Sequence, residues 1–307
     1  MSEKDRPTPL QQSYWLALRG TQQMDLALRF AGAAQSQTLR VLALKGISIA
    51  DELYGGVQNR PMADVDFLVV DTPRFEAAGQ IARALGWVEV GASDHALVFK
   101  EPVSGVVLEL HVSLTACPGL FTVDHRALWD RRAAVSGTPM FRLADPDLVV
   151  HLALHTTFQH AYSANEYHYG DFVRAVETLK PSRDQVLASA REWGALKALG
   201  AMTLVCRRNA PESPALAELT EWARPHCPDA VARWIDAQDP MPPPLRVGSL
   251  AFVRYHLAPS KWRYLTRTLF PKPIPGRTWP GSGRVRRLAN LVDAGLFPPS
   301  PEGRAPR

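Results

Sequence analysis

The chain has 307 residues, of which 46% are hydrophobic and 21% charged, and its net charge is +5. This composition is that of an ordinary globular protein with one large domain or two moderate ones. It has no apolar run of about 18 residues, so we expect no membrane span, and residues 1–8 lack the hydrophobic region of a signal peptide. The three cysteines include no CxxC pair, which argues against a disulfide framework and a structural zinc site. We therefore expect a cytoplasmic protein.

The first 122 residues predict a mixed sheet with flanking helices. Asp71-Thr72-Pro73 is a typical helix start, with a capping residue before proline. Residues 106–114 alternate most cleanly between an apolar face and a face that carries Glu109 and His111. The pattern predicts helices over 10–34, 47–54 and 73–85, and strands over 41–44, 64–70, 87–90, 96–100 and 106–114.

The rest of the chain predicts a mostly α-helical region over 123–270. Asp145-Pro146-Asp147 starts one helix, and Pro242-Pro243-Pro244 marks a break. Further helices are expected over 166–180, 182–199, 200–209, 215–224 and 246–257. We expect residues 271–307, rich in Pro and Arg, to form an irregular tail. The predicted fold class is therefore α+β, with a mixed sheet followed by helices.

Positive charge is concentrated near the C-terminal end. From Lys261 onward there are ten Lys or Arg and two acids, a balance of +8, so residues 1–260 sum to −3. A basic segment with aromatic residues can contact RNA, and it can also meet an anionic membrane surface or an acidic partner. The simpler interpretation is a solvated terminus that needs no partner.

Asp64 and Asp66 stand two apart at the start of an apolar, β-prone run. Residues i and i+2 of a strand point to the same face, so both carboxylates would project side by side. Adjacent carboxylates repel each other unless a cation lies between them, and Mg²⁺ prefers carboxylate oxygens together with substrate phosphates. The alternative is a solvated turn or a helix cap.

Two further features indicate the same chemistry. The strand over 41–44 runs into Lys45-Gly46 and a helix, whose first N–H groups can receive phosphate oxygens. Glu109 is an acid on an otherwise apolar strand and joins the aspartates if the two strands are neighbours. Three carboxylates beside a phosphate-binding turn suit nucleotidyl transfer, in which two cations about 3.5–4 Å apart contact the attacking and the leaving oxygen.

The segments Leu44–Tyr54, Arg60–Val69 and Leu108–His111 resemble a known family. They are similar to the uncharacterised nucleotidyltransferases of the DNA polymerase β-like superfamily, which have a glycine motif opening a helix, an Asp-x-Asp on the next strand and a later third carboxylate. The resemblance covers about residues 35–115 and extends weakly to His151–His155 and Asp171. It implies that Gly46 takes the glycine position, Asp64 and Asp66 those of the paired metal ligands, and Glu109 that of the third acid.

The chain departs from the superfamily pattern after Gly46, where Ile47 replaces the usual Gly or Ser. Ser48 could supply the missing hydroxyl. The gap before Asp64 is longer than in the shortest members and leaves room for a loop that carries Arg60.

Several candidates have a second interpretation. Lys45 and Arg60 could contact phosphate or could pair with nearby carboxylates. His111 could contact substrate or could be a half-buried structural histidine. Asp171 could contact a base or sugar or could be a helix-surface acid.

His151 and His155 have an i, i+4 spacing that can bind zinc. A zincin needs Glu directly after the first His, however, and Leu152 stands there, so we do not predict a zinc site.

The residues and the resemblance together predict a Mg²⁺-dependent nucleotidyltransferase. Asp64, Asp66 and Glu109 would hold two Mg²⁺ ions, or Mn²⁺, and Lys45, Gly46, Ser48 and Arg60 would bind an NTP such as ATP. The acceptor would be a hydroxyl of a sugar, peptide or other small tailoring substrate. The alternatives are a tRNA- or protein-directed toxin-like transferase and a nucleotide- or RNA-binding protein without catalysis. Clustered acids argue against the last, because RNA binding gains nothing from them.

Overall fold

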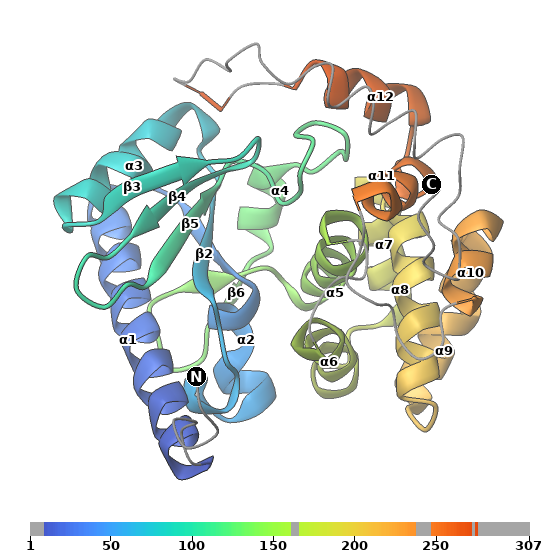
Figure 1. Cartoon of the computed structure of the whole chain (residues 1–307), viewed down its shortest axis with the longest axis horizontal. Helices are drawn as coiled ribbons and strands as arrows, with labels where there is room; N and C mark the ends of the chain where they lie inside the picture. Colours follow the sequence, from blue (N-terminus) through green and yellow to red (C-terminus); the bar gives the residue numbers. More distant parts are fainter. Residues whose placement is uncertain (1–8, 161–165, 238–246, 272–273, 276–307) are drawn as a thin grey trace, which may run out of the picture. The chain divides into compact units, whose positions relative to one another are not determined.

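A computed structural model describes residues 9–160, 166–237, 247–271 and 274–275, which fall into two compact units (Figure 1). Unit 1 comprises Met1–Val112 and His125–Ala144, and unit 2 comprises Ser113–Asp124 and Asp145–Arg307. The chain thus passes from unit 1 into unit 2, returns, and leaves again. The domain boundary expected after residue 122 falls inside the short first segment of unit 2.

Unit 1 contains a seven-stranded mixed sheet in the order β3-β4-β5-β2-β1-β7-β6. The central strand β2 pairs antiparallel with β1 and parallel with β5. The strands are β1 (Val41–Leu44), β2 (Asp64–Val69), β3 (Val88–Ala92), β4 (Ala96–Lys100), β5 (Val107–His111), β6 (Ala133–Ala134) and β7 (Phe141–Arg142). The five strands predicted before residue 115 are all present, although the last ends at His111.

Helices flank this sheet. The ring of Phe30 on the first helix packs against Phe67 of β2, with ring centres 5.0 Å apart, and both side chains are fully buried. Because neighbouring strand residues point to opposite faces, Asp64 and Asp66 lie on the face away from that helix. The helices are α1 (Pro9–Ser36), α2 (Lys45–Tyr54), α3 (Phe75–Ala84) and α4 (His125–Asp130), with short 3-10 helices at Val57–Asn59 and Thr72–Arg74.

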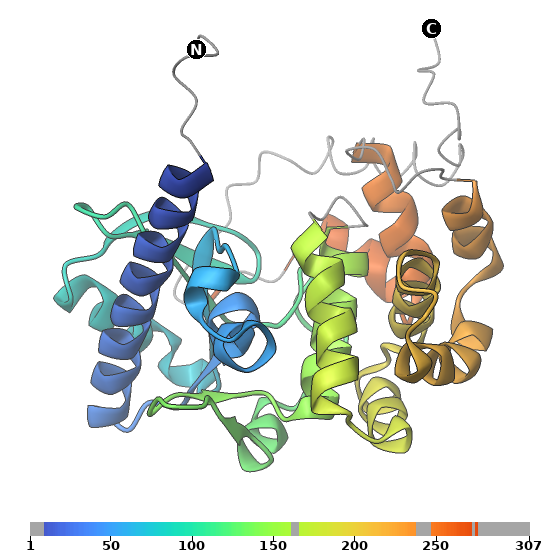
Figure 2. The ribbon, with the colours of Figure 1, turned by 90° about the horizontal axis from the view of Figure 1, so that it is seen from below.

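The described part of unit 2 consists of helices, preceded by the irregular segment Ser113–Asp124 (Figure 2). Its core includes the fully buried Trp193, whose carbonyl accepts a hydrogen bond from the Thr122 N–H. The α-helices are α5 (Asp145–Leu154), α6 (Glu166–Arg174), α7 (Arg183–Trp193), α8 (Leu196–Asn209), α9 (Pro214–Ala223), α10 (Asp229–Asp236), α11 (Val247–Leu257) and α12 (Lys261–Leu269). Two π-helices, His155–Gln159 and Ala175–Leu179, follow α5 and α6, and a 3-10 helix spans Arg224–His226.

The helix break predicted after residue 199 was wrong. The chain breaks at Gly194, which ends α7 with a left-handed φ of 75°. Gly200 instead lies inside α8, where an added Cβ would come within 2.4 Å of the Ala223 carbonyl oxygen. Gly200 therefore allows close packing between helices, whereas Gly194 ends a helix.

The α+β class is confirmed, while the helices α4, α10 and α12 and the small strands β6 and β7 were not predicted one by one. The proline break at 242–244 and almost all of the tail beyond 271 lie outside the described residues. Within the described part of the chain, no helix combines the length and apolar character needed to cross a membrane.

Candidate active site

The predicted carboxylates meet on two neighbouring strands. Asp64 and Asp66 lie on β2, and Glu109 lies on β5, which pairs with it in parallel. The register sets Asp66 directly opposite Glu109. Residues opposite one another on paired strands share a face, so the three acids project from one side of the sheet. The condition under which Glu109 would join the aspartates, that the two strands are neighbours, is met.

Two cationic groups converge on Asp66, which is only 2% exposed. Lys45 Nζ and His111 Nε2 each lie 2.8 Å from Asp66 Oδ1. His111 Nε2 is also 3.3 Å from Glu109 Oε2. Of the two interpretations considered for Lys45, the ion pair with a carboxylate is therefore the one present, and His111 bridges two of the acids.

These contacts separate the three carboxyls by proton affinity. The Asp66 carboxylate, and after it burial, raise the pKa of Asp64 to about 7. Burial also opposes ionisation of Asp66, but Lys45 and His111 outweigh it and hold the pKa of Asp66 well below its ordinary value. The hydrogen bond with His111 lowers the pKa of Glu109. At neutral pH Asp66 and Glu109 are therefore ionised, whereas Asp64 is close to its pKa and exchanges its proton.

The two cationic partners respond in the opposite direction. Burial works to lower the pKa of both Lys45 and His111, and the neighbouring carboxylates, Asp66 first and then Glu109 among the others, more than offset it, so both pKa values are raised. Lys45 is thus held as an ammonium inside the acidic cluster.

The turn from β1 into α2 is closely packed around Gly46. Lys45 has a left-handed φ of 50°. A Cβ on Gly46 would lie 2.7 Å from Arg60 Nη1 and from Met62 Cγ, so any other residue here would force these side chains to shift. The buried Arg60 donates to the Pro61 carbonyl at 2.8 Å. The turn thereby brings Arg60 beside the start of α2.

The other predicted residues occupy different surroundings. The Ser48 hydroxyl is buried and donates to the Lys45 carbonyl at 2.8 Å, so it braces the turn. Asp171 lies on α6 in unit 2 and is 1% exposed, so the interpretation as a helix-surface acid was wrong. Its contact with a base or sugar stays a prediction.

His95 is a neighbour of this cluster that the sequence did not reveal. It is buried just before β4, and its ring centre lies 5.5 Å from that of His111. Asp94 Oδ1 lies 2.7 Å from its Nδ1, while burial lowers the pKa of His95. The pairing of β4 with β5 sets Ala96 opposite His111 and so places the preceding His95 near it. His95 could have been found only if this register had been known from the sequence.

The donor set fits a divalent cation. Asp66, Glu109 and His111 each offer a ligand atom within 4.8 Å of the others, and Asp64 adjoins them on the same face. Carboxylate oxygens are the ligands that Mg²⁺ and Mn²⁺ prefer. The arrangement can therefore hold a metal ion against a negatively charged substrate.

Comparison with known proteins gives one extensive match. Residues 9–211 match the family described as uncharacterised nucleotidyltransferase. No functionally curated protein matches the sequence.

Three solved structures are similar at low identity. They are the solution structure of the antibiotic-resistance factor ANT(2'')-Ia (15% identity, TM-score 0.43, 56% of this chain and 91% of that chain), the crystal structure of ANT(2'')-Ia in complex with adenylyl-2''-tobramycin (14%, 0.42, 56% and 97%), and an antigenic nucleotidyltransferase-like protein from Paracoccidioides brasiliensis (14%, 0.37, 66% and 92%). These TM-scores are below 0.5, so the assignment does not depend on them. The family match spans well over half of the chain and includes all three carboxylates, and the chain therefore belongs to the uncharacterised nucleotidyltransferase family.

Proposed function

We propose that this nucleotidyltransferase moves a nucleoside monophosphate from an NTP to an acceptor hydroxyl in a Mg²⁺-dependent reaction. The observation that carries the proposal is the placement of Asp66 directly opposite Glu109, with Asp64 on the same face. Structural ion pairs alone would not explain three acids facing two cationic groups. Such a surplus of carboxylates suits a bound cation and a polyphosphate.

Each residue then has a role. Asp64, Asp66 and Glu109 would hold Mg²⁺, or Mn²⁺, which when bound supplies positive charge against the triphosphate. Glu109 would accept the proton of the acceptor hydroxyl, whose oxygen forms a bond to the α-phosphorus. The bond from that phosphorus to the bridging oxygen breaks, and pyrophosphate leaves. Lys45, Gly46, Ser48 and Arg60 would bind the phosphates at the turn, and His111 would orient Asp66 and Glu109.

We propose a small-molecule or peptide hydroxyl as the acceptor, with ATP as the first nucleotide to test. We also propose a cytoplasmic setting, in which buried free thiols such as those of the three cysteines persist. Asp171 is proposed to contact the base, sugar or acceptor.

The first experiment avoids the unknown acceptor. Thermal unfolding of the full chain is measured with each NTP, with and without Mg²⁺, for the wild type and Asp66→Asn, with Asp51→Asn as a matched control because Asp51 is an exposed acid of α2. We expect a Mg²⁺-dependent stabilisation by NTP that Asp66→Asn loses and Asp51→Asn keeps. A stabilisation that is indifferent to Mg²⁺ and to Asp66→Asn would overturn the metal role.

The second experiment identifies the reaction. The protein is incubated with α-labelled NTP, Mg²⁺ and separate pools of sugars, peptides, tRNA and proteins, and products are read by mass. A gain of one nucleoside monophosphate with release of pyrophosphate supports the proposal, and the pool that gains it names the acceptor class. A gain of bare phosphate, or no pyrophosphate from any pool, contradicts it.

A further inference from the structure

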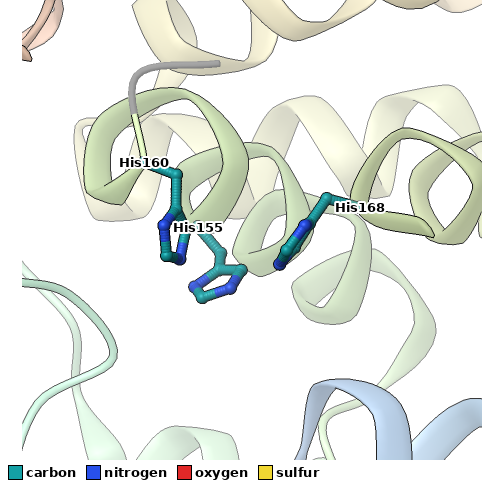
Figure 3. A group of neighbouring side chains, drawn as sticks. All are labelled: His155, His160 and His168. Carbon is teal, nitrogen blue, oxygen red and sulfur yellow. The ribbon is translucent and has the colours of Figure 1, made fainter. Parts of the chain in front are cut away.

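Three histidines of unit 2 gather around one point. His155 begins the first π-helix, His160 follows its last residue, and His168 lies on α6. One ring nitrogen of each histidine lies within 4.8 Å of those of the other two. Figure 3 shows the rings facing a common space, with His155 between the other two.

The π-helix is what brings His155 and His160 together. The His160 N–H donates to the His155 carbonyl at 3.2 Å, the i→i+5 bond that defines this wider turn. Residues five apart on an α-helix are rotated by about 140° from one another. The wider turn brings them to nearly the same side. Such turns are rare and are found frequently at functional sites.

The spacing of the three rings matches that of metal ligands. Their centres are 4.5 Å apart for His155 and His160, and 5.2 Å apart for each of the other two pairs. An ion held about 2.0–2.1 Å from one nitrogen of each ring, at tetrahedral angles, would set the ring centres about 5 Å apart. The observed ring spacing is therefore close to that of a three-histidine metal site.

The surroundings suit a site that is both anchored and accessible. His155 is 3% exposed, whereas His160 and His168 are half-buried and open in part to solvent. Three imidazoles favour Zn²⁺ and its neighbours among the transition metals, whereas the carboxylates of unit 1 favour Mg²⁺.

We propose that His155, His160 and His168 bind a divalent transition-metal ion, for which Zn²⁺ is the probe. Three protein ligands leave a fourth position for water or an anionic ligand, as in zinc sites that remain open. The site uses His155 without His151, whose ring centre lies 6.1 Å away, so it differs from the i, i+4 pair considered in the sequence. It is independent of the proposed nucleotidyl transfer.

The test measures metal binding and needs no activity. Untagged full-length protein is stripped of metal, and its Zn²⁺ affinity is measured by competition with a chromogenic chelator, with the visible spectrum of bound Co²⁺ as a second readout. The variants are His160→Gln and His168→Gln, which change half-buried side chains and leave the buried His155 in place. The controls are His226→Gln, an exposed histidine of the same unit, and Asp66→Asn, which alters the acidic cluster. Circular dichroism verifies the fold of each variant.

We expect about one equivalent of Zn²⁺ that is bound at least ~10–100-fold more weakly in His160→Gln and in His168→Gln, since altering even an outer partner of a metal ligand costs that much. His226→Gln and Asp66→Asn should retain this site, and Co²⁺ should show the spectrum of tetrahedral nitrogen ligation in the wild type. The proposal is overturned if the wild type binds no Zn²⁺, or if folded His160→Gln and His168→Gln bind it as tightly as the wild type. Loss of the site in Asp66→Asn alone would also overturn it, by assigning the ion to unit 1.

Discussion

Asp66 Oδ1 is shared by two hydrogen-bond donors, Lys45 Nζ and His111 Nε2. Replacement of Asp66 by Asn keeps the shape but removes the negative charge that both donors and the proposed cation need. Loss of a metal ligand forfeits several kcal/mol of transition-state stabilisation, so transfer should fall by at least ~1000-fold. Steady-state pyrophosphate release checks this, with Asp51→Asn at wild-type rate. A rate in Asp66→Asn within a few-fold of wild type would contradict the metal role.

Asp64 makes metal binding dependent on pH. Its pKa of about 7 means that below this pH the cation must displace a proton. The Mg²⁺ affinity should therefore rise as pH increases from about 6 to 8, by up to about tenfold per unit at the acidic end. Calorimetric titration at several pH values checks this. In Asp64→Asn the affinity should be weak and nearly flat, and an equally steep slope there would assign the proton to another group.

The stability of the metal-free protein should change with pH in the opposite direction to its Mg²⁺ affinity. The folded pKa of Asp64 lies above its ordinary value of 3.8, so between about pH 4 and 7 the folded state binds the extra proton. The free energy of unfolding should therefore fall as pH rises through this window, and Asp64→Asn should remove that part of the decline. Urea unfolding in chelator measures it, and a slope unchanged in Asp64→Asn would reject this origin.

At the residue scale the acids could be predicted because a period of two is visible within one strand. Asp64 and Asp66 share a face whatever their strand pairs with. The contact of His95 with His111 could not be predicted, and the sequence could not decide between a phosphate and a carboxylate partner for Lys45, because both depend on register between segments far apart in the chain.

The turn between β1 and α2 gives a prediction at the scale of elements. Gly46→Ala would force Arg60 and Met62 to move, because the new Cβ would overlap both at 2.7 Å. We expect a loss of stability of about 1–3 kcal/mol, typical of overpacking, together with reduced NTP binding. Thermal unfolding and nucleotide titration measure the two effects.

Gly32→Ala is the matched control for this substitution. Gly32 lies in α1 with nothing within 4 Å of an added Cβ. It should gain about 0.5–1 kcal/mol, since alanine favours a helix over glycine. Equal effects of the two variants would show that the close approach at Gly46 is unimportant.

A second element-scale prediction concerns the start of β1 and the end of β2. Asp71 accepts hydrogen bonds from both the Arg40 backbone N–H and its guanidinium. The guanidinium hydrogen bond holds the pKa of Asp71 below its ordinary value. The stabilisation by the Arg40–Asp71 pair is therefore fully present above the pKa that Asp71 has in the unfolded chain. It is lost as the pH falls through the lower pKa that Asp71 has in the folded protein. Asp71→Asn should lower the free energy of unfolding at neutral pH by up to about 1 kcal/mol, a modest amount because solvent screens the pair. The loss should be smaller near about pH 3.

Urea unfolding at the two pH values checks this, with Glu76→Gln as the control from an exposed ion pair with Arg83. A loss in Asp71→Asn that is the same at both pH values would mean that shape, and not charge, carries the contact.

Strands were easier to predict than the helical half. Residues 41–44 and 96–100 are apolar runs bounded by polar or glycine-containing turns, and both form strands with the predicted bounds. In unit 2 the pattern could not distinguish Gly194, which ends a helix, from Gly200, which packs one helix against another. The residue is glycine at both positions, and only its neighbours in the folded structure differ.

At the scale of the whole molecule, residues 125–144 belong with the sheet although they follow a segment of unit 2. Arg132 lies over the rings of Trp129 and Phe141, at 4.1 and 4.4 Å, and the buried Arg142 pairs with Glu52 of α2 at 2.7 Å. A fragment of residues 1–144 should therefore melt cooperatively, whereas one of residues 1–122 should melt at a lower temperature or aggregate. Circular dichroism compares them, and identical melting curves would argue that the returning segment adds nothing.

The pairing of β1 with β7 also has a consequence for synthesis on the ribosome. Ala43 is made early, but its parallel partner Arg142 emerges about a hundred residues later. Until then one edge of β1 carries unpaired N–H and C=O groups, which are a template for joining another nascent chain. We therefore expect the aggregation risk from this edge to end when β7 leaves the exit tunnel, well before the last helices of unit 2 are complete.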